Sequence, residues 1–245
     1  MSAPPSSVAS AAPKAVLDRL AGPVRQMDQA RWEAAWLERE TPGYYREPWY
    51  RVEGAWRPNV DDEHYGRVEK LHRSLAPYFV RCLGVYELGC GPGQNLDRLR
   101  RIYPDKGFVG LDWAKSAVDA VRARGIPAEW FDMRAPSFGL SCDTGILTAG
   151  AMEQLGESWG PIFHWMLTTK PKVVVHVEPL YELYDPQDPF DQVAMAWHER
   201  RGYLRGYLPA IREAAVRGVL EILECRRTFG GMMHDGYSVL AWKPI

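Results

Sequence analysis

The sequence predicts an α/β domain with a mostly parallel, doubly wound sheet, preceded by a helical N-terminal segment. Two observations support this fold class. After residue 84, short β-branched runs alternate with helical stretches, which is typical of βαβ units. The chain then ends on two β-rich runs joined by a glycine-rich connection, which predicts an antiparallel hairpin at the edge of the sheet.

Residues 14–84 are expected to form a helical, aromatic-rich cap or lid. An apolar stripe predicts a helix over 14–39, interrupted at Gly22-Pro23, and a second stripe predicts one over 62–81 with Asp62 as its cap. Between them, Tyr44 to Trp56 crowds aromatic residues onto a segment without a clean period. Such residues line a pocket or pin a loop onto the core, and the sequence leaves both readings open.

Residues 85–245 are expected to form the main domain. Its predicted strands cover 85–88, 108–111, 128–131, 144–148 and 173–177, and its predicted helices cover 95–103, 116–124 and 161–169. A long helical section is expected over 190–216, followed by β-rich runs over 219–228 and 237–243.

Composition narrows the possible functions. The 245 residues carry a formal net charge of −1, which argues against a general electrostatic grip on nucleic acid or on an anionic membrane. No apolar stretch approaches the length of a membrane span. The start of the chain, residues 1–13, is rich in Ser, Ala and Pro and is expected to be a disordered tail rather than a secretory signal.

The four cysteines, Cys82, Cys90, Cys142 and Cys225, match neither a zinc site nor a C-x-x-C redox motif. Scattered thiols of this kind favour a reducing compartment, so we expect a cytoplasmic protein. No metal-ligand spacing is present, and we expect no metal.

The most specific motif is Glu87-Leu88-Gly89-Cys90-Gly91-Pro92-Gly93-Gln94-Asn95, placed between a predicted strand and a predicted helix. Glycines there allow a tight turn and a close approach of the backbone to a ligand. A dinucleotide fingerprint is G-x-G-x-x-G, whereas this loop is G-x-G-x-G. The acidic Glu87 suits a cationic or zwitterionic ligand better than a pyrophosphate.

Residues 85–96 resemble motif I of the class I S-adenosylmethionine-dependent methyltransferases, E/D-x-G-x-G-x-G, and the resemblance extends through most of 85–245. It implies the sheet order 3-2-1-4-5-7-6 with strand seven antiparallel. It also implies S-adenosylmethionine as cofactor, with S-adenosylhomocysteine as product. Its motif I places six residues of this chain at the cofactor: Glu87, Gly89, Cys90, Gly91, Gly93 and Asn95.

The ends of the next strands continue this register. Asp112 ends the second predicted strand, where an acidic residue can bind ribose hydroxyls. The resemblance places Trp113 against the adenine, Asp132 near the adenine amino group and Met133 beside the ring. It also places the backbone near Thr148 against the methionine part of the cofactor.

Candidate catalytic residues follow the fourth and fifth strands. Met152-Glu153-Gln154 resembles a Leu-Glu-His-like motif of small-molecule methyltransferases, with Gln where His is common, which leaves no histidine base at this position. Alternation places His176 and Glu178 on one face at a strand end, where His176 is a candidate general base. The alternatives are a core histidine and a capping or ion-paired Glu178.

Four residues are candidates for contact with the acceptor: Tyr45, Trp49, Tyr181 and His234. Tyr45 and Trp49 belong to the aromatic segment, and His234 lies at the expected tip of the terminal hairpin, where it is a turn residue or closes over the acceptor.

The sequence therefore predicts a methyltransferase that acts on an O or N atom of a small, planar or apolar molecule such as a secondary metabolite. The alternatives are a protein or peptide methyltransferase and a non-catalytic S-adenosylmethionine-binding module. The glycine spacing opposes a nicotinamide or flavin oxidoreductase. The absence of an Asn-Pro-Pro-Tyr-like element after the fourth strand opposes a nucleic-acid methyltransferase. The acceptor and the oligomeric state are not specified.

Overall fold

The computed structural model describes residues 12–24, 27–37, 47–141 and 143–245. Almost all of the expected tail and part of the aromatic segment, including Tyr44 and Tyr45, lie outside these ranges.

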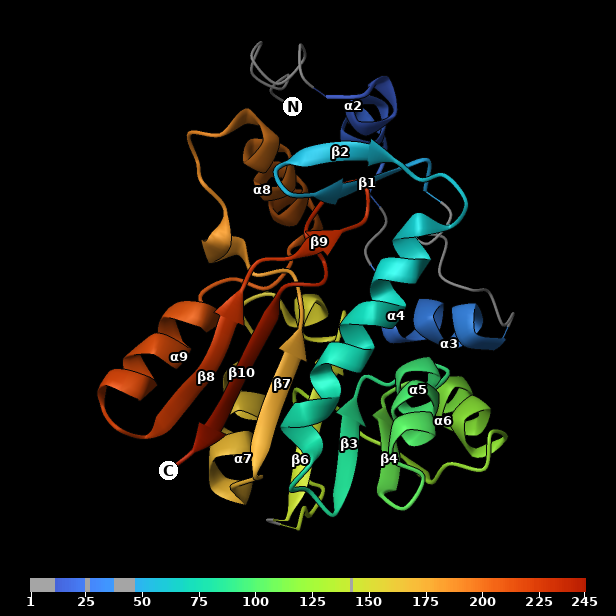
Figure 1. Cartoon of the computed structure of the whole chain (residues 1–245), viewed down its shortest axis with the longest axis vertical. Coiled ribbons are helices and arrows are strands. Elements are labelled where there is room, and N and C mark those ends of the chain that lie inside the picture. Colours follow the sequence, from blue (N-terminus) through green and yellow to red (C-terminus); the bar gives the residue numbers. More distant parts are fainter. Residues whose placement is uncertain (1–11, 25–26, 38–46, 142) are drawn as a thin grey trace.

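A seven-stranded sheet forms the centre of the molecule, in the order β5-β4-β3-β6-β7-β10-β8 (Figure 1). Counted along the main domain, this is the predicted order 3-2-1-4-5-7-6. Five strands pair in parallel: β3 (Gly84–Leu88), β4 (Gly107–Asp112), β5 (Ala128–Trp130), β6 (Thr144–Ala149) and β7 (Val173–Val177). As predicted, β10 (Val239–Pro244) is antiparallel, pairing with β7 and with β8 (Leu220–Arg226).

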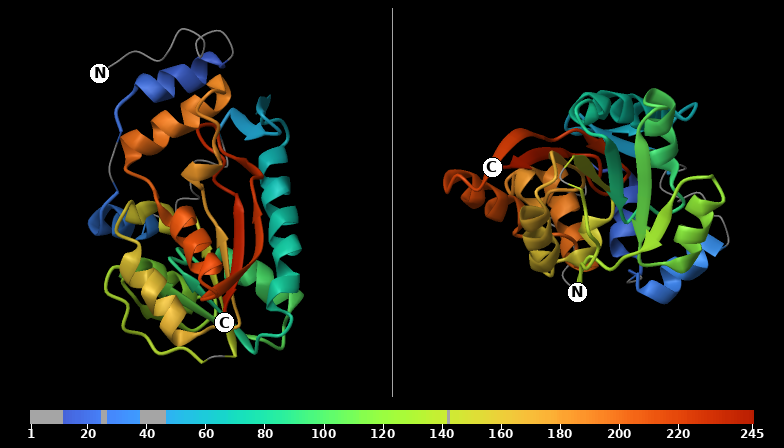
Figure 2. Two further views of the ribbon diagram at one scale, coloured as in Figure 1. Left: turned by 90° about the vertical axis from the view of Figure 1, so that its left-hand side faces the viewer. Right: turned by 90° about the horizontal axis from the view of Figure 1, so that it is seen from below.

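Helices cover both faces of this sheet (Figure 2). One face packs against α4 (Glu63–Leu75), the 3-10 helix η2 (Ala76–Phe79), α5 (Gln94–Ile102) and α6 (Lys115–Arg122). The other packs against α7 (Gly160–Thr169) and α9 (Tyr207–Val216). Every residue of β7 is buried, as expected for a strand covered on both faces.

The N-terminal segment is less helical than predicted. Its helices α2 (Lys14–Ala21) and α3 (Gln29–Leu37) are separated near Gly22-Pro23 as expected. The segment after them, however, contains a β-hairpin of β1 (Trp49–Val52) and β2 (Ala55–Pro58), in place of irregular backbone. The turn is made by Glu53 and Gly54, both with positive φ. The sequence pattern missed it because aromatic residues lie on both faces of these short strands.

Three further expectations are corrected. Asp62 precedes α4 in a left-handed conformation, and its side chain makes no capping hydrogen bond, so it is not the predicted cap. α4 itself is not part of a cap, because its buried residues Val68, Leu71 and Leu75 share a core with the sheet. The helical section over 190–216 is divided into α8 (Pro189–Arg201) and α9 at Gly202, which has a φ of 61°.

The connection between β8 and β10 is more than a hairpin turn. Within it, β9 (Phe229–Gly230) pairs with β1 and completes a small sheet in the order β2-β1-β9. This pairing joins the C-terminal loop to the N-terminal hairpin above the carboxyl ends of the parallel strands (Figure 1).

Candidate cofactor and acceptor site

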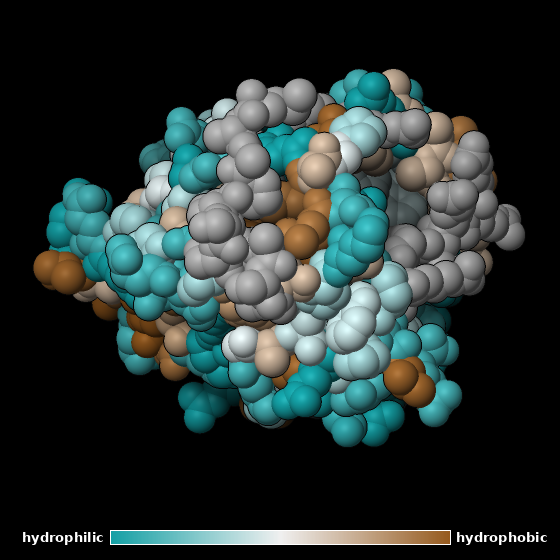
Figure 3. Space-filling view, turned by 90° about the horizontal axis from the view of Figure 1, so that it is seen from above, coloured by the Kyte–Doolittle hydropathy of each residue, from teal (hydrophilic) through white to brown (hydrophobic). Residues whose placement is uncertain are grey.

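A cavity of about 580 Å³ opens at the carboxyl ends of the parallel strands. This volume is within the usual range for small-molecule sites, and the position is where open α/β sheets bind ligands. The loops after β3, β4, β5 and β6 form its floor, and α3, α8 and the loop over 231–237 contribute most of its walls. Seen from above, apolar residues lie in a hollow of this face (Figure 3).

The glycine loop after β3 has the strained backbone that only glycine tolerates well. Gly89, Gly91 and Gly93 all have positive φ, at 66°, 50° and 79°. A Cβ on Gly89 would lie 2.4 Å from the Cβ of Ala151, and one on Gly91 would lie 3.1 Å from the ring of Trp36. Gly89, Cys90 and Gly91 line the cavity, whereas Gly93 is the N-cap residue of α5 and packs against Val121.

Asp112 ends β4 beside this loop and lines the cavity. Its Oδ2 atom accepts the backbone N–H of Gly91 at 2.9 Å, and its Oδ1 atom accepts that of Ala114 at 2.9 Å. Burial raises the pKa of Asp112 to about 6, although these N–H groups favour the ionised form. The carboxylate thus joins the glycine loop to the start of α6.

Glu87 lies fully buried beneath the loop. Its Oε1 atom accepts a hydrogen bond from Nδ2 of Asn95 at 2.7 Å, while its Oε2 atom has no hydrogen-bond partner among the described residues. Burial raises the pKa of Glu87 to about 8, and the Asn95 contact only partly opposes this. An unpaired buried oxygen of this kind can accept a donor from a bound ligand.

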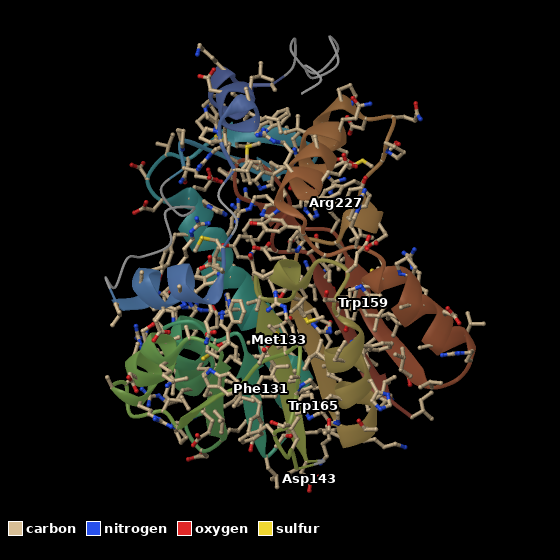
Figure 4. All side chains as sticks on the ribbon, turned by 180° about the vertical axis from the view of Figure 1, so that it is seen from behind. Phe131, Met133, Asp143, Trp159, Trp165 and Arg227 are labelled. Atoms are coloured by element: carbon tan, nitrogen blue, oxygen red, sulfur yellow. The ribbon has the colours of Figure 1, made fainter. Side chains whose placement is uncertain are left out.

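The ends of β4 and β5 supply the opposite part of the floor. Trp113, Asp132 and Met133 all line the cavity. The Trp113 ring lies under the guanidinium of Arg134, 4.8 Å away, and Asp132 accepts the backbone N–H of Arg134 at 2.8 Å. Met133 lies just beyond Phe131, whose ring packs against Trp165 with centroids 5.3 Å apart (Figure 4).

Helix α3, part of the segment expected to form a cap, covers this floor through two tryptophans that the sequence analysis did not single out. Trp32 and Trp36 line the cavity and stack on each other with centroids 5.3 Å apart. Gln29 donates to the carbonyl of Trp113 at 2.8 Å, and Glu33 accepts the backbone N–H of Ser116 at 3.1 Å. The four-residue spacing of the two tryptophans placed them on one helix face, but it did not indicate which part of the fold that face contacts.

Glu178 anchors the loop after β6 rather than facing the cavity. Its carboxylate accepts the backbone N–H groups of Ala151, Met152 and Glu153 at 3.0, 3.0 and 3.2 Å. Burial raises its pKa to about 7. The side chain that these contacts position is Glu153, which lines the cavity and whose pKa burial and the neighbouring Glu178 raise to about 8.

His176 is a core histidine, and the prediction that it is a catalytic base is not supported by its position. Trp242 donates to its Nε2 atom at 3.1 Å and the Tyr207 hydroxyl lies 2.8 Å from the same atom, so its Nδ1 atom carries the proton that faces Thr148 Oγ1 at 2.9 Å. Burial lowers its pKa to about 3. Neither His176 nor the side chain of Thr148 belongs to the cavity lining.

The candidate acceptor residues are divided. His234 lines the cavity. Trp49 instead packs with Val16, Leu20 and Met232 in the apolar cluster under α2. Tyr181 also lies outside the lining, because its hydroxyl bonds Glu199 at 2.9 Å and its ring lies under Arg205. Tyr45 falls outside the described residues.

Three solved structures with a similar arrangement are methyltransferases. The magnesium protoporphyrin IX methyltransferase ChlM of Synechocystis PCC 6803, with bound S-adenosylmethionine, matches with a TM-score of 0.54 over 91% of this chain and 100% of its own, at 12% identity. The O-methyltransferase NcsB1 from neocarzinostatin biosynthesis, in complex with S-adenosylhomocysteine and 1,4-dihydroxy-2-naphthoic acid, matches with 0.53 over 76% of this chain, at 14% identity. The plantazolicin methyltransferase BpumL with S-adenosylhomocysteine matches with 0.51 over 86% of this chain and 92% of its own, at 11% identity.

This chain has the class I S-adenosylmethionine-dependent methyltransferase fold.

Within that fold, the alignment with NcsB1 covers only 57% of NcsB1, so more than a third of that protein has no counterpart here. No protein-family model matches this chain, and no curated protein matches it by sequence. None of the described helices is long and apolar enough to cross a membrane. In the described part of the chain, no three His, Cys, Asp or Glu side chains are grouped as metal ligands.

The methyltransferase fold also assembles residues that sequence reasoning missed. Besides the α3 tryptophans, the cavity is lined by Arg134, Trp197, Tyr203, Met232, Met233 and Tyr237. Most of them come from α8 and from the loop before β10, segments that form no motif and meet only in three dimensions.

Proposed function

We propose that this protein is an S-adenosylmethionine-dependent methyltransferase that acts on an O or N atom of a small molecule. The observation that carries the proposal is the pairing of Asp112 with the glycine loop at the floor of the cavity. The Gly91 N–H donates to the Asp112 carboxylate while both residues line the cavity. A carboxylate held at a strand end in this way can accept ribose hydroxyls.

The residues present suit this cofactor. Asp112 would bind the ribose, Asp132 and Met133 would flank the adenine, and Glu87 would favour the ammonium of the methionine part. The glycine loop places no side chain between the backbone and a ligand. Larger residues are excluded at Gly89 and Gly91, because Cβ atoms there would meet Ala151 and Trp36. The Oε2 atom of Glu87, which bonds no described residue, is a further point of fit, since a cationic donor would satisfy it.

The bound cofactor would supply an activated methyl group, and the protein aligns the acceptor with it and excludes water. Glu153 is the titratable side chain of the cavity on the loop after β6. With its pKa near 8, it can hold or accept a proton close to neutral pH. The anchored loop over 151–153 holds Glu153 in place for either role.

The upper part of the cavity favours a planar or apolar acceptor. Trp197, Met232, Met233 and Tyr237 line it, and side chains of this kind pack on flat apolar groups. The bound naphthoic acid of the similar NcsB1 supports an aromatic acceptor.

Thermal unfolding with S-adenosylhomocysteine tests the proposal, with NAD as the control ligand. A ligand at about 100 times its dissociation constant stabilises a protein by roughly 2.7 kcal/mol. For a chain of this size we expect the midpoint to rise by about 5–10 °C. The same shift with NAD, or none with S-adenosylhomocysteine, would contradict the proposed cofactor.

A further inference from the structure

The acceptor part of the cavity contains a pair of histidines, one buried and one at the cavity wall. His234, in the loop between β9 and β10, lines the cavity, and His198, on α8, lies behind it and is fully buried. The Nδ1 atom of His234 and the Nε2 atom of His198 lie 3.2 Å apart, so one histidine donates to the other. The Nδ1 atom of His198 has no hydrogen-bond partner among the described residues.

The ring of His234 has a defined orientation. Its Nδ1 edge faces His198, and it stacks on the ring of Tyr203 with centroids 5.5 Å apart. Its Nε2 edge faces Gly236, another residue of the cavity lining, where a Cβ would lie 3.3 Å from Nε2. The absence of a side chain at Gly236 therefore leaves room beside this nitrogen.

The unpaired nitrogen of His198 decides which tautomer is present. If His234 donated, His198 would carry its own proton on Nδ1, and a buried N–H would have no acceptor. If His198 donates from Nε2, only a lone pair on its Nδ1 is left unpaired. Orphaned N–H groups are the rarer and costlier of the two in protein interiors. In the favoured arrangement, His234 therefore bears its proton on Nε2 and presents it to the cavity.

Burial, together with the positive charges around the pair, keeps both rings neutral. Arg201 on α8 bonds the Tyr203 hydroxyl through Nε at 3.0 Å, and its charge lies near His234. Arg51 of β1 also faces the pair but is held by Asp191 and Asp235 at 3.3 Å each. Burial and these two arginines lower the pKa of His234 to about 3. Glu153, the acidic group on the loop below, is close to neutral at pH 7 because its own pKa is near 8.

We propose that His234, held by His198, donates its Nε2–H to a carbonyl or carboxylate oxygen of the methyl acceptor. The acceptor is thereby assigned to aromatic ketones, amides and acids rather than to plain hydrocarbons or simple phenols. The positive charge of Arg201 at the same wall makes a carboxylate the stronger ligand of the two. This inference rests on the proposed function in one respect: the rest of the cavity is taken to hold S-adenosylmethionine.

A first experiment reads the tautomer without any ligand. In protein labelled with ¹⁵N-histidine, nitrogen shifts distinguish a protonated ring nitrogen from a bare one. His234→Phe, which keeps the stacking on Tyr203, assigns the His234 resonances by their loss. We expect the proton of His234 on Nε2 and that of His198 also on Nε2. A proton on Nδ1 of His234 would overturn the proposal.

A second experiment measures binding of three probes of similar shape in the presence of saturating S-adenosylhomocysteine: 2-naphthoate, 2-acetylnaphthalene and 2-ethylnaphthalene. We expect affinity to fall in that order, with a gap of about tenfold or more between the naphthoate and the hydrocarbon. His234→Phe should remove most of this gap, and Gly236→Ala, which crowds Nε2, should reduce it. His164→Phe, at an exposed histidine of α7, is the matched control and should leave the gap intact.

The outcomes separate this inference from the proposed function. Equal affinity for the three probes, no binding of either oxygen-bearing probe, or an unchanged gap in His234→Phe would overturn the role of His234. Binding of S-adenosylhomocysteine, measured beforehand in the same calorimeter, reports on the cofactor alone. His198→Leu tests the positioning role, because it should reduce the probe gap while cofactor affinity stays unchanged.

Discussion

Glu178 accepts the backbone N–H of Ala151 at 3.0 Å, and this contact ties the end of β7 to the loop that follows β6. The same carboxylate holds the next two N–H groups of that loop. A side chain that sequence reasoning placed among catalytic candidates thus stabilises the start of a 3-10 helix, η3 (Met152–Leu155), and positions Glu153.

Replacing Glu178 separates positioning from catalysis. Glu178→Ala leaves three buried N–H groups without an acceptor, and each such loss costs about 1–3 kcal/mol. We expect the variant to lose roughly 3 kcal/mol or more of unfolding free energy in urea, together with activity. Glu178→Gln keeps one acceptor oxygen and should retain more of both. If Glu178→Gln were fully stable but inactive, a proton-transfer role would be indicated instead.

Replacing His176 should affect stability and leave the chemistry alone. In His176→Leu, the side chains of Thr148, Tyr207 and Trp242 lose a buried partner, so we expect the thermal midpoint to fall by several degrees. The pH profile of kcat/KM for the surviving enzyme should match that of the wild type. Loss of one limb of that profile would return His176 to the catalytic candidates.

The cofactor half of the site was predictable because each residue follows a strand. Parallel strands end at one edge of the sheet, so Gly89, Asp112 and Asp132 had to meet once the strand pattern was recognised. The glycine spacing and the acidic residues provided the register, and sheet order followed from the family resemblance. All three residues line the cavity.

The acceptor half could not be predicted in the same way. Trp36 reaches the site from a separate N-terminal helix and Trp197 from α8, and neither was a candidate, whereas His234 was a candidate and reaches the site from the loop before β10. Their contacts depend on β9 pairing with β1, which are distant in the sequence. Local patterns carry no information on such pairing. They therefore gave no reason to prefer His234, which lines the cavity, over His176 and Trp49, which do not.

Asp112→Ala should abolish most cofactor affinity. The substitution removes the proposed ribose ligand and also the acceptor for the Gly91 and Ala114 N–H groups. We expect the dissociation constant for S-adenosylhomocysteine to rise by about 100-fold, which corresponds to roughly 2.7 kcal/mol. Circular dichroism should show an unchanged fold. Normal calorimetric binding by this variant would mean that Asp112 is not at the ribose.

Cofactor binding should release a proton from Glu87. In the ligand-free protein its pKa of about 8 keeps this carboxyl mostly protonated at pH 7. A bound ammonium favours the carboxylate, so affinity should rise with pH until about pH 8 and then level off. Calorimetry of S-adenosylhomocysteine in buffers of different ionisation enthalpy measures the release. Glu87→Gln should bind without it, and equal release by both proteins would assign the proton elsewhere.

The buried ion cluster around Arg51 should be the most sensitive point outside the cofactor site. Arg51, fully buried on β1, bonds Asp191 of α8, Asp235 of the loop beside His234 and the carbonyl of Phe190. Arg227 contacts the same two carboxylates. Removing one member of a buried ion pair costs about 3–5 kcal/mol, and without Arg51 the two buried carboxylates would share the single positive charge of Arg227. Arg51→Met should therefore destabilise the protein by that amount and loosen the wall that holds His234.

A double-mutant cycle tests this origin of the loss. Arg51→Met with Asp235→Asn removes one positive and one negative charge, so we expect the pair to be less destabilising than the sum of the two single changes. Urea unfolding of the four proteins measures the coupling. Simple additivity would mean that Arg51 stabilises the fold through its packing on Phe190, 3.5 Å from the ring centroid, rather than through its charge.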